Sequence, residues 1–593
     1  MCGIVGQYCS GSDAASLAGL EKANLRQFSR GPDNGGSFAA GGLALGHRRL
    51  KIFDLSERAA QPMVDHALGL ALTFNGAIYN FRELRGELES RGYRFVSRSD
   101  TEVLLKAWHA WGAACLARLN GMFAFAIFER DSGKLFLARD RMGIKPLYYA
   151  KTREGFQFAS TLPALLAFEG IDTSIDPLAL HYYLTFHAVP EPLTILAGVK
   201  KAPAGAVMTI HSDGATTQET YWRLSVDEAR ADRAKGMADW EAETRAALTL
   251  ATNRQLSADV PIGVLLSGGL DSSLLVALAA QTRGSDINTF SIGFEGAQGE
   301  SGDEFFYSDL VARHFGARHC QMFISNQGLE DSLADCVRAM SEPMVSHDNI
   351  GFFLLSREVA KHVKVVLSGQ GADEMFAGYH WFQNLSGEPV SSAQAADQIL
   401  AKVADRSFAD YQRLVTPDYL AGDHARAFLQ SLCRENGSSR LADHLLVYES
   451  TFALANGPLE RVDNMTMASG LEARVPFLDE AVVDLARTMP LEAKLAEGGK
   501  AVLKRIGRKL LPNEVVDRPK GYFPVPALKY LKGGALDLLR DALSPDNIRR
   551  RGIFNIAEVQ PLLDRPEDFL TPTGGSKLWQ VGLLEYWLQC QGL

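Results

Sequence analysis

One glycine-rich stretch constrains the fold of this chain most, because it lies between an apolar run and a helix-like run. Residues 264–266 are Val-Leu-Leu, SGGLDSS follows at 267–273, and mostly apolar residues continue to Ala280. This order predicts a strand, a tight loop and a helix, whose N–H groups bind an anion. An ordinary turn would explain Ser-Gly-Gly alone, but the whole stretch favours a phosphate site. Asp271 stands where the common P-loop has its lysine, so we expect Mg²⁺ to bridge this acid to phosphates.

The residues around this loop alternate between helix-like and strand-like segments. Helical periodicity covers 240–255 and 307–315, and short apolar runs at 287–294 and 363–367 read as strands. Such alternation predicts a parallel, doubly wound α/β sheet, which binds ligands at the carboxyl ends of its strands. A second glycine-rich loop, SGQGADE at 368–374, also follows a strand. Both loops are therefore expected at one site, where Asp271 and Asp373 share the Mg²⁺.

Length and composition indicate a multidomain globular enzyme. The chain has 593 residues, 46% hydrophobic and 22% charged, so two to four domains are expected. A net charge of −9 without a long basic tract argues against nucleic acid as a partner. No apolar run reaches the ~18 residues of a membrane span, and no secretory signal is expected. The seven cysteines form no CxxC pair, which favours a cytoplasmic location and neither zinc nor disulfides.

A cysteine follows the initiator methionine. If Met1 is removed, the Cys2 thiol and a free α-amine share one carbon atom. Such an amine has a pKa of about 7.7–8.0 and can act as the base for its own side chain. A cysteine near a terminus is usually incidental, so this position alone does not establish a nucleophile.

Two further segments each carry one structural and one chemical interpretation. Asn75-Gly76 follows a strand-like run at 70–74 and is first a hairpin signal, but the Asn75 amide and the Gly76 N–H could also stabilise an oxyanion. Ser99 or Asp100 could cap a helix, and Asp100 could instead hold a substrate ammonium. Residues 46–54 read as a strand that carries cations, and 121–127 as a buried strand.

Together these segments resemble the class II glutamine amidotransferase domain. The motifs MCGI, RGPD, HRRL, FNGAIYN, SDTE, GMFAFAI and RDRMGIKPLYY occur in this order over about 150 residues. The resemblance implies an N-terminal nucleophile (αββα) sandwich that hydrolyses glutamine. One position departs, because Ala77 replaces the acid of the usual Asn-Gly-Glu, which should weaken glutamine binding. The roles carried over are nucleophile for Cys2, oxyanion stabilisation for Asn75 and Gly76, and glutamine binding for Arg49, Leu50, Ile52, Asn75, Gly76 and Asp100.

A change in composition divides the chain. Strand-like pieces continue to about Trp222, and residues 226–239 are charged, alanine-rich and poor in large apolar side chains. We therefore expect a glutaminase domain at 1–225, a linker at 226–237 and a second domain at 238–593.

The second domain resembles the asparagine synthase domain of the N-type ATP pyrophosphatase superfamily. The resemblance rests on the two loops and on RVDNMTM at 461–467, LEARVPFLD at 471–479, KAVLK at 500–504 and RPKG at 518–521. It implies α/β and α+β architecture overall, with C-terminal helices after the parallel sheet. It implies a catalytic Lys500, although a solvated helix residue is the ordinary interpretation, and Mg²⁺ at Asp271 and Asp373. The ATP-binding positions it implies are Leu266, Ser267, Gly268, Gly269, Asp271, Ser272, Ile292, Ser368 and Gly369.

The implied chemistry adenylates a carboxylate with ATP and amidates it with ammonia from glutamine. Asparagine synthetases usually carry Glu where this chain has Gln370, which suits an acceptor without a free amine. Gln370 and Glu374 are the expected acceptor-site residues. The segments 302–309, 518–530 and 575–579 are similar to bacterial N-acetylglutaminylglutamine amidotransferases. Asparagine synthetase and a non-catalytic or ammonia-only relative are the alternatives; the partners are small molecules, and a homodimer is allowed.

Overall fold

The computed structural model describes most of the chain. It covers residues 2–9, 15–225, 232, 234–296, 302–383, 385, 389–518, 525–572 and 574–593, without the side chains of 526 and 527. Most of the linker expected at 226–237 lies outside these residues, as do positions 519–524 of the 518–530 segment.

The first part of the chain is a sandwich of two antiparallel sheets. One sheet has the order β10-β8-β9-β1-β3-β2 and the other β12-β11-β7-β6-β5-β4. Apolar side chains of both sheets, such as Ile4, Leu45 and Ala124, interdigitate between them. The strands are β1 (Cys2–Tyr8), β2 (Asn34–Ala40), β3 (Leu43–Arg49), β4 (Met63–Asp65), β5 (Leu70–Ile78), β6 (Gly121–Glu129), β7 (Lys134–Arg139), β8 (Tyr148–Thr152), β9 (Gly155–Ala159), β10 (Lys200–Lys201), β11 (Ala206–Ile210) and β12 (Thr216–Thr220).

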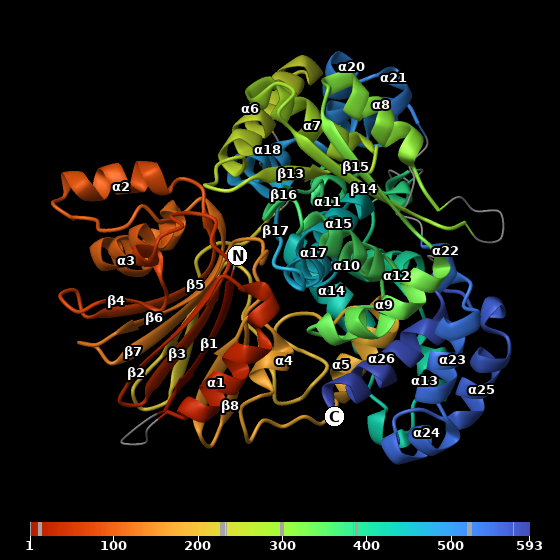
Figure 1. The fold of residues 1–593 in the computed structure, drawn as a ribbon. Helices are drawn as coiled ribbons and strands as arrows, with labels where there is room; N and C mark the ends of the chain where they lie inside the picture. Colours follow the sequence, from red (N-terminus) through yellow and green to blue (C-terminus); the bar gives the residue numbers. More distant parts are fainter. Residues whose placement is uncertain are drawn as a thin grey trace.

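Helices cover the two outer faces of this sandwich (Figure 1). Helix α1 (Leu17–Arg26) packs on β1 and β3, and α3 (Asp100–Trp111) packs on β5 beside α2 (Phe81–Ser90). The expected αββα sandwich is therefore confirmed. Ser99 is the N-cap of α3, since its side chain accepts a hydrogen bond from the Glu102 N–H at 3.3 Å. Two helices, α4 (Leu162–Leu165) and α5 (Pro177–Phe186), interrupt the strand-like pieces that the sequence predicted before Trp222.

The structure excludes one of the two interpretations of Asn75-Gly76, and it shortens the strand expected over 46–54. Asn75-Gly76 is not a hairpin turn, because β5 continues to Ile78 and pairs with β6 along its whole length. Glycine is needed there because a Cβ on Gly76 would lie 2.3 Å from the Met122 carbonyl oxygen. The strand expected over 46–54 ends at Arg49, and the chain turns at Asp54, whose φ is +48°.

The second part is built on a parallel sheet with the order β15-β14-β13-β16-β17. Figure 1 shows helices on both faces. On one side α7 (Leu270–Arg283) and α8 (Phe305–Phe315) contact β13 and β14, and on the other α10 (Asp348–Val359) and α17 (Pro458–Met467) contact β14 and β17. The doubly wound α/β architecture is thus confirmed. The strands are β13 (Ile262–Leu265), β14 (Asn288–Phe294), β15 (Arg318–Ile324), β16 (Val365–Leu367) and β17 (Glu472–Arg474).

Strand β17 was not predicted, and its composition explains why. Its sequence is Glu-Ala-Arg, so charged residues stand where a buried strand usually has apolar ones. All three residues are nevertheless buried, and the strand pairs with β16 from Val365 to Leu367. Since β13 pairs with β14 on one side and β16 on the other, the order of the strands reverses beside β13, which is where open α/β sheets bind ligands.

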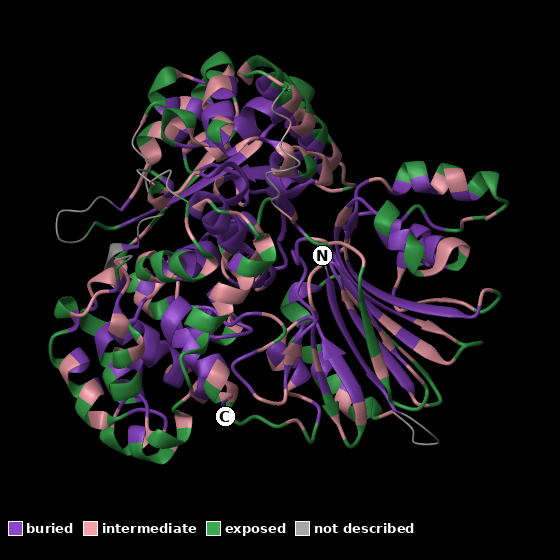
Figure 2. Cartoon of the chain, turned by 180° about the vertical axis from the view of Figure 1, so that it is seen from behind, coloured by how far each residue is buried: buried purple, intermediate pink, exposed green. Residues whose placement is uncertain are grey.

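Helices complete the second part, and Figure 2 shows their outer faces exposed while the central strands of the sheets are buried. The helices that pack around the parallel sheet are α6 (Met237–Gln255), α7 (Leu270–Arg283), α8 (Phe305–Phe315), α9 (Asn326–Ala339), α10 (Asp348–Val359), α11 (Ala372–Phe376), α17 (Pro458–Met467), α18 (Glu480–Thr488) and α20 (Ala501–Leu510). The remaining longer helices are α12 (Ser392–Val403), α13 (Phe408–Leu414), α14 (His424–Asn436), α15 (Leu441–Val447), α23 (Gly533–Ala542), α24 (Pro545–Arg551), α25 (Ile556–Asp564) and α26 (Lys577–Gln591).

Candidate active sites

The first site surrounds Cys2 at the start of β1. Cys2 lies opposite Arg49 in the β1–β3 pairing, and both side chains are buried. Burial raises the pKa of the Cys2 thiol, so the thiol is protonated near neutral pH and needs a base before it can attack. The pocket around it is lined by Cys2, Arg49, Leu50, Ile52, Phe53, Gln61, Phe74, Gly76, Asp100, Thr101 and Glu472.

Asn75 holds the backbone of Cys2 and keeps one polar group unused. Its Oδ1 accepts a hydrogen bond from the Cys2 N–H at 3.0 Å. Its Nδ2 is buried and has no hydrogen-bond partner among the residues that the structure describes. A buried donor without a partner is costly unless a ligand completes it. Beside Cys2, this amide is suited to receive the oxyanion of a tetrahedral intermediate.

Two charged side chains of the pocket are fixed by backbone groups. The Arg49 guanidinium donates to the Ser56 carbonyl at 2.9 Å and to the Asp54 carbonyl at 2.5 Å. Asp100 accepts from the Ile78 N–H at 3.0 Å, yet burial raises the pKa of its carboxyl to about 6. The cation and the acid stand on opposite elements of one pocket, as an amino acid's carboxylate and ammonium would require.

The parallel-sheet half contributes a side chain that the sequence reasoning missed. Glu472, in β17, lines the Cys2 pocket and accepts from the Arg474 Nε at 2.5 Å. Burial would raise its pKa, but nearby positive charges, Arg474 among them, hold it at about 2. The motif at 471–479 contained this residue, but only the packing of the two halves reveals that it reaches the other site.

The second site is a cavity of about 810 Å³ at the carboxyl ends of the parallel strands. Both glycine-rich loops meet there, since a Cβ on Gly369 would lie 3.1 Å from the Asp271 Cβ. Gly268 is required by its φ of +73° and because a Cβ would lie 2.6 Å from the Tyr307 Cβ. The predicted residues that line this cavity are Leu266, Ser267, Gly269, Asp271, Ser272, Ile292, Ser368, Gly369, Gln370, Asp373 and Lys500.

Lys500 joins the two loops. Its Nζ lies 2.6 Å from Asp271 Oδ2 and 2.9 Å from Asp373 Oδ1. Burial would lower the Lys500 pKa, but these two carboxylates hold it well above its usual range, so the ammonium stays charged. Its backbone has a φ of +53°, a strained conformation for a side chain of this size. Lys500 is therefore not a solvated helix residue, and its ammonium is fixed between the two glycine-rich loops.

Each half of the fold matches a different known protein family. Residues 243–589 match the asparagine synthase family, and residues 1–222 match the glutamine amidotransferase domain. The chain is 34% identical to asparagine synthetase (glutamine-hydrolyzing) 1 of Bacillus subtilis, over 99% of this chain and 96% of that protein. It belongs to the glutamine-dependent asparagine synthetase family.

Other relatives agree with this membership. The chain is 30% identical to asparagine synthetase (glutamine-hydrolyzing) 3 of Bacillus subtilis, over 88% of this chain and 87% of that protein. It is 29% identical to asparagine synthetase B of Escherichia coli K12, over 88% of this chain and 82% of that protein. The protein is thus a glutamine-dependent carbon–nitrogen ligase of a family that uses ATP as a substrate. None of its described helices combines the length and apolar character of a membrane span.

The residues of the synthetase cavity fit a magnesium ion. Asp271 and Asp373 bring two carboxylates close enough to contact one ammonium group. Within the described ranges, no cluster of three or more His, Cys, Asp or Glu side chains could hold a metal by itself. One or two carboxylates together with substrate phosphates are the usual ligands of Mg²⁺ in nucleotide sites.

A second cavity of about 250 Å³ adjoins the synthetase cavity, and we call it the side cavity. The predicted acceptor-site residue Glu374 lines the side cavity, whereas Gln370 lines the larger one. Asp348, Tyr379 and Arg461 line both and were missed by the sequence reasoning. The structure therefore separates the two acceptor predictions between adjoining spaces.

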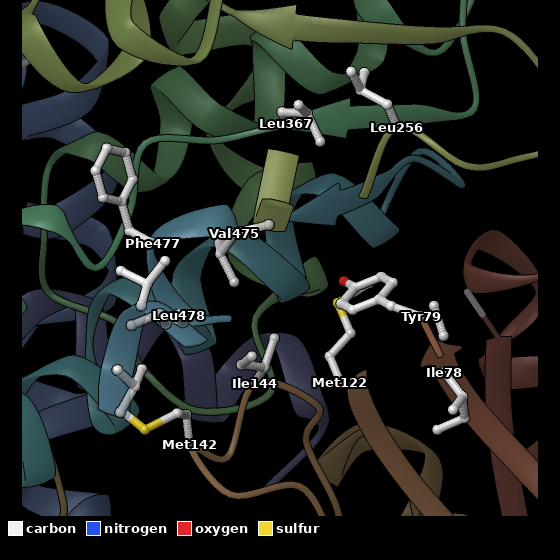
Figure 3. Close-up of a cluster of buried hydrophobic side chains, with 14 of the residues drawn as sticks. Ile78, Tyr79, Met122, Met142, Ile144, Leu256, Leu367, Val475, Phe477 and Leu478 are labelled. Carbon is white, nitrogen blue, oxygen red and sulfur yellow. The ribbon is translucent and has the colours of Figure 1, made fainter. Parts of the chain in front are cut away.

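Apolar side chains from both halves of this synthetase pack together at part of the junction, which also holds the buried ion pairs of Arg30 and Lys145 with Asp463. Ile78, Met122 and Ile144 from the sandwich belong to one buried cluster with Val475 and Leu367 from the parallel-sheet half. In Figure 3, Met122 and Ile144 lie beside Val475 at the junction, and Ile78 and Leu367 lie farther out in the same cluster. We call this cluster the seam.

Proposed function

We propose that this protein couples glutamine hydrolysis at Cys2 to the ATP-driven amidation of N-acetylglutaminylglutamine at its C-terminal carboxylate. The observation that supports it most is the Lys500 ammonium held between Asp271 and Asp373, at the meeting point of two phosphate-type loops. The glutaminase half at 1–225 and the synthetase half at 238–593 are the proposed working units.

In the glutaminase half, the Cys2 thiol attacks the carboxamide carbon of glutamine after its proton passes to the free α-amine. The Asn75 Nδ2–H and the Gly76 N–H stabilise the oxyanion, and the unused Asn75 donor supports this role. Ammonia leaves, and water then releases glutamate from the thioester. Arg49 binds the α-carboxylate of glutamine, and Asp100 binds its ammonium, with Leu50 and Ile52 as apolar walls.

In the synthetase half, the acceptor carboxylate attacks the α-phosphate of ATP, and pyrophosphate leaves. Lys500 stabilises the charge that develops on the phosphate oxygens, because its ammonium is already fixed and shielded from water. Mg²⁺ held by Asp271 and Asp373 would neutralise the pyrophosphate. Ammonia then attacks the acyl carbon of the acyl-AMP, and AMP leaves.

The seam is the proposed route for ammonia. Free ammonia is mostly protonated in neutral water, and an ammonium ion is not a nucleophile. The seam side chains are buried and apolar, so they exclude water and disfavour protonation. Ammonia released at Cys2 would therefore arrive at the acyl-AMP as an uncharged nucleophile.

The choice of acceptor rests on Gln370. A glutamate at this position could pair with the ammonium of aspartate, whereas the neutral amide of Gln370 suits an acylated amine. Aspartate is the second candidate, because the relatives of known name are asparagine synthetases. A non-catalytic or ammonia-only role has little support, since Cys2 and the SGGLDSS loop are both present.

An acceptor screen tests the proposal. Purified protein is given ATP, Mg²⁺ and glutamine with either N-acetyl-Gln-Gln or aspartate, and pyrophosphate and the amide product are measured. We expect kcat/KM for the dipeptide to exceed that for aspartate by about 100-fold or more, since a mismatched polar group at a buried site costs that much. Asparagine formation at the rate of the best acceptor would establish the aspartate alternative instead.

A further inference from the structure

The side cavity has no assigned role in glutamine hydrolysis or in ATP binding. It lies between the end of α5, in the first half of the chain, and the helices of the second half. It meets the synthetase cavity at Asp348, Tyr379 and Arg461. Its volume of about 250 Å³ compares with the roughly 10–15 Å³ that admits one water molecule. A ligand that reaches both cavities would therefore extend well beyond the reacting carboxylate.

One wall of the side cavity carries a strained histidine. His187 follows α5 with a φ of +49°, a backbone conformation that residues other than glycine rarely adopt. Its Nδ1 lies 3.1 Å from Asp405 Oδ2, and Asp405 also accepts from Gln580 Nε2 at 3.1 Å. This chain of contacts fixes the imidazole at the cavity wall. Strain of this kind is concentrated at ligand clamps, where the surrounding structure holds it in place.

The C-terminal helix supports the same wall from behind. Gln580 of α26 receives the Arg406 Nε–H at 3.1 Å, and the neighbouring Trp579 donates its indole N–H to the Val345 carbonyl at 2.9 Å. Val345 lies between two residues that line the side cavity, Met344 and Ser346. The cavity is thus built on rigid elements, as a binding site requires.

The side cavity is also lined by a π-helical turn, η7 (Tyr448–Ala453), whose Tyr448 and Phe452 rings pack against Phe186 of α5. Such turns are rare and are frequent at functional sites. Tyr379 and Trp381 stack beside this region, with ring centroids 4.5 Å apart. Together with Tyr448 and Phe452 they give the cavity an aromatic lining that suits the flat faces of amide groups.

Three buried polar atoms of cavity-lining residues indicate what the ligand offers. The Trp381 Nε1–H and the Arg461 Nε–H are donors without a partner among the described residues, and Asn349 Oδ1 is an acceptor without one. Unsatisfied buried groups are costly and require a water or a ligand. Donors and acceptors together match an amide, which has both a carbonyl and an N–H.

The cations around the side cavity are largely neutralised. Arg461 lies 3.2 Å from Asp348, and Lys201 lies 2.7 Å from Glu342. A second carboxylate on the ligand would compete with these existing pairs. The part of a ligand that occupies the side cavity is therefore expected to carry no carboxylate.

We propose that the side cavity binds the N-acylated, amide-bearing tail of the acceptor, while the carboxylate enters the synthetase cavity beside Tyr379 and Arg461. This inference rests on the proposed function, because it assigns the position of the same acceptor. His187, Trp381 and Asn349 become residues that determine specificity for the length and polarity of the tail.

Filling the cavity tests the inference. Ala453→Phe adds a ring at the cavity wall, and Ala557→Phe adds the same ring on the exposed surface of α25 as a matched control. Pyrophosphate release is measured with ammonium in place of glutamine, using N-acetyl-Gln-Gln and the shorter N-acetyl-Gln. We expect Ala453→Phe to lower kcat/KM for the dipeptide about 10-fold or more, chiefly through KM, and to affect N-acetyl-Gln much less.

Each result bears on one of the two proposals. If Ala453→Phe leaves kcat/KM for both acceptors at the values of the unchanged protein, the side cavity does not hold the tail, and the acceptor assignment stands. If the unchanged protein prefers aspartate, the acceptor assignment fails and the inference fails with it. Glutaminase activity reports folding of the variant. If Ala453→Phe does not fold, Trp381→Phe is measured instead. We expect it to raise KM for the dipeptide about 3- to 10-fold. An unchanged KM would show that the inference is wrong.

Discussion

The two active sites of this protein are built in opposite ways. The pocket at Cys2 has about 30 Å³ of free space, whereas the synthetase cavity has about 810 Å³. Paired strands supply the key residues of the first, with Cys2 on β1, Arg49 on β3 and Asn75 on β5. Loops after parallel strands supply those of the second. A tight pocket suits one small substrate and keeps ammonia from water, while a large cavity admits ATP and an acceptor together.

The two sites also differ in how their buried carboxylates are neutralised. Asp100 is buried and its pKa is raised to about 6, so it depends on a ligand ammonium for full ionisation. Asp271 and Asp373 are held by the Lys500 ammonium at 2.6 and 2.9 Å. The glutaminase site is therefore completed by its substrate, whereas the synthetase site carries its own countercharge.

The largest expected effect separates the two sites chemically. Cys2→Ala removes the nucleophile, so glutamine-dependent amide synthesis should fall by about 10³-fold or more. Ammonia-dependent synthesis should stay unchanged, because the synthetase cavity does not contain Cys2. Both rates are measured by amide formation, with Cys9→Ala as the control for loss of another buried thiol of the same segment. Full activity with glutamine in Cys2→Ala would contradict the nucleophile assignment.

A substitution at Lys500 should have the opposite effect, with loss of the synthetase reaction and retention of glutamine hydrolysis. Lys500→Met keeps the side-chain length but removes the cation between Asp271 and Asp373, so pyrophosphate release should fall about 10²- to 10³-fold. Glutamine hydrolysis should continue, since Lys500 does not line the Cys2 pocket. Lys509→Met, at an exposed position of α20, the helix that Lys500 precedes, is the matched control. Equal pyrophosphate release by the Lys500 and Lys509 variants would show that the cation does not act on the phosphates.

A smaller effect should follow from the raised pKa of Asp100. In the proposed role of Asp100, the ionised carboxylate binds the glutamine ammonium. A pKa of about 6 means that the acid is mostly ionised at pH 7 and mostly protonated at pH 5. The KM for glutamine should therefore rise about tenfold as pH falls from 7 to 5. Steady-state glutaminase assays across this range measure it. Asp100→Asn should bind glutamine weakly and without this pH dependence; a flat profile in the unchanged protein would exclude the role.

Local patterns in the sequence predicted much of both sites. SGGLDSS and SGQGADE gave the strand–loop–helix order and placed Asp271 and Asp373 at one edge of the sheet, because parallel strands end on the same side. Asn75-Gly76 illustrates the limit, since its local signal is a turn and only the β6 partner shows that the strand continues. A local pattern describes what a segment favours by itself, and pairing partners can override it.

Contacts between distant segments could not be predicted in this way. Glu472 reaches the Cys2 pocket because β17 lies at the junction of the two halves, and its charged composition gives no sign of a buried strand. Lys500 is buried and has a φ of +53°, and its helix-like surroundings in the sequence indicate neither. The side cavity likewise needs α5 from one half and η7 from the other.

The smallest expected effect tests how the two sites are joined. Ile144 is buried in the seam, where a polar group would attract water. Ile144→Thr and Ile144→Val remove similar volume, but only threonine introduces a hydroxyl. Ammonia that meets water becomes protonated and is lost, so Ile144→Thr should raise the glutamate released per amide formed about twofold, as expected for a single buried hydroxyl. The valine variant should keep the ratio of the unchanged protein.

Both products are counted in one reaction mixture, and ammonia-dependent synthesis is measured alongside. An unchanged rate with added ammonia would show that the synthetase cavity is intact and that only the transfer has changed. If both substitutions raise the ratio equally, lost volume rather than water entry opens the seam. If neither does, ammonia does not pass Ile144, and the tight pocket and the large cavity must be connected by another path.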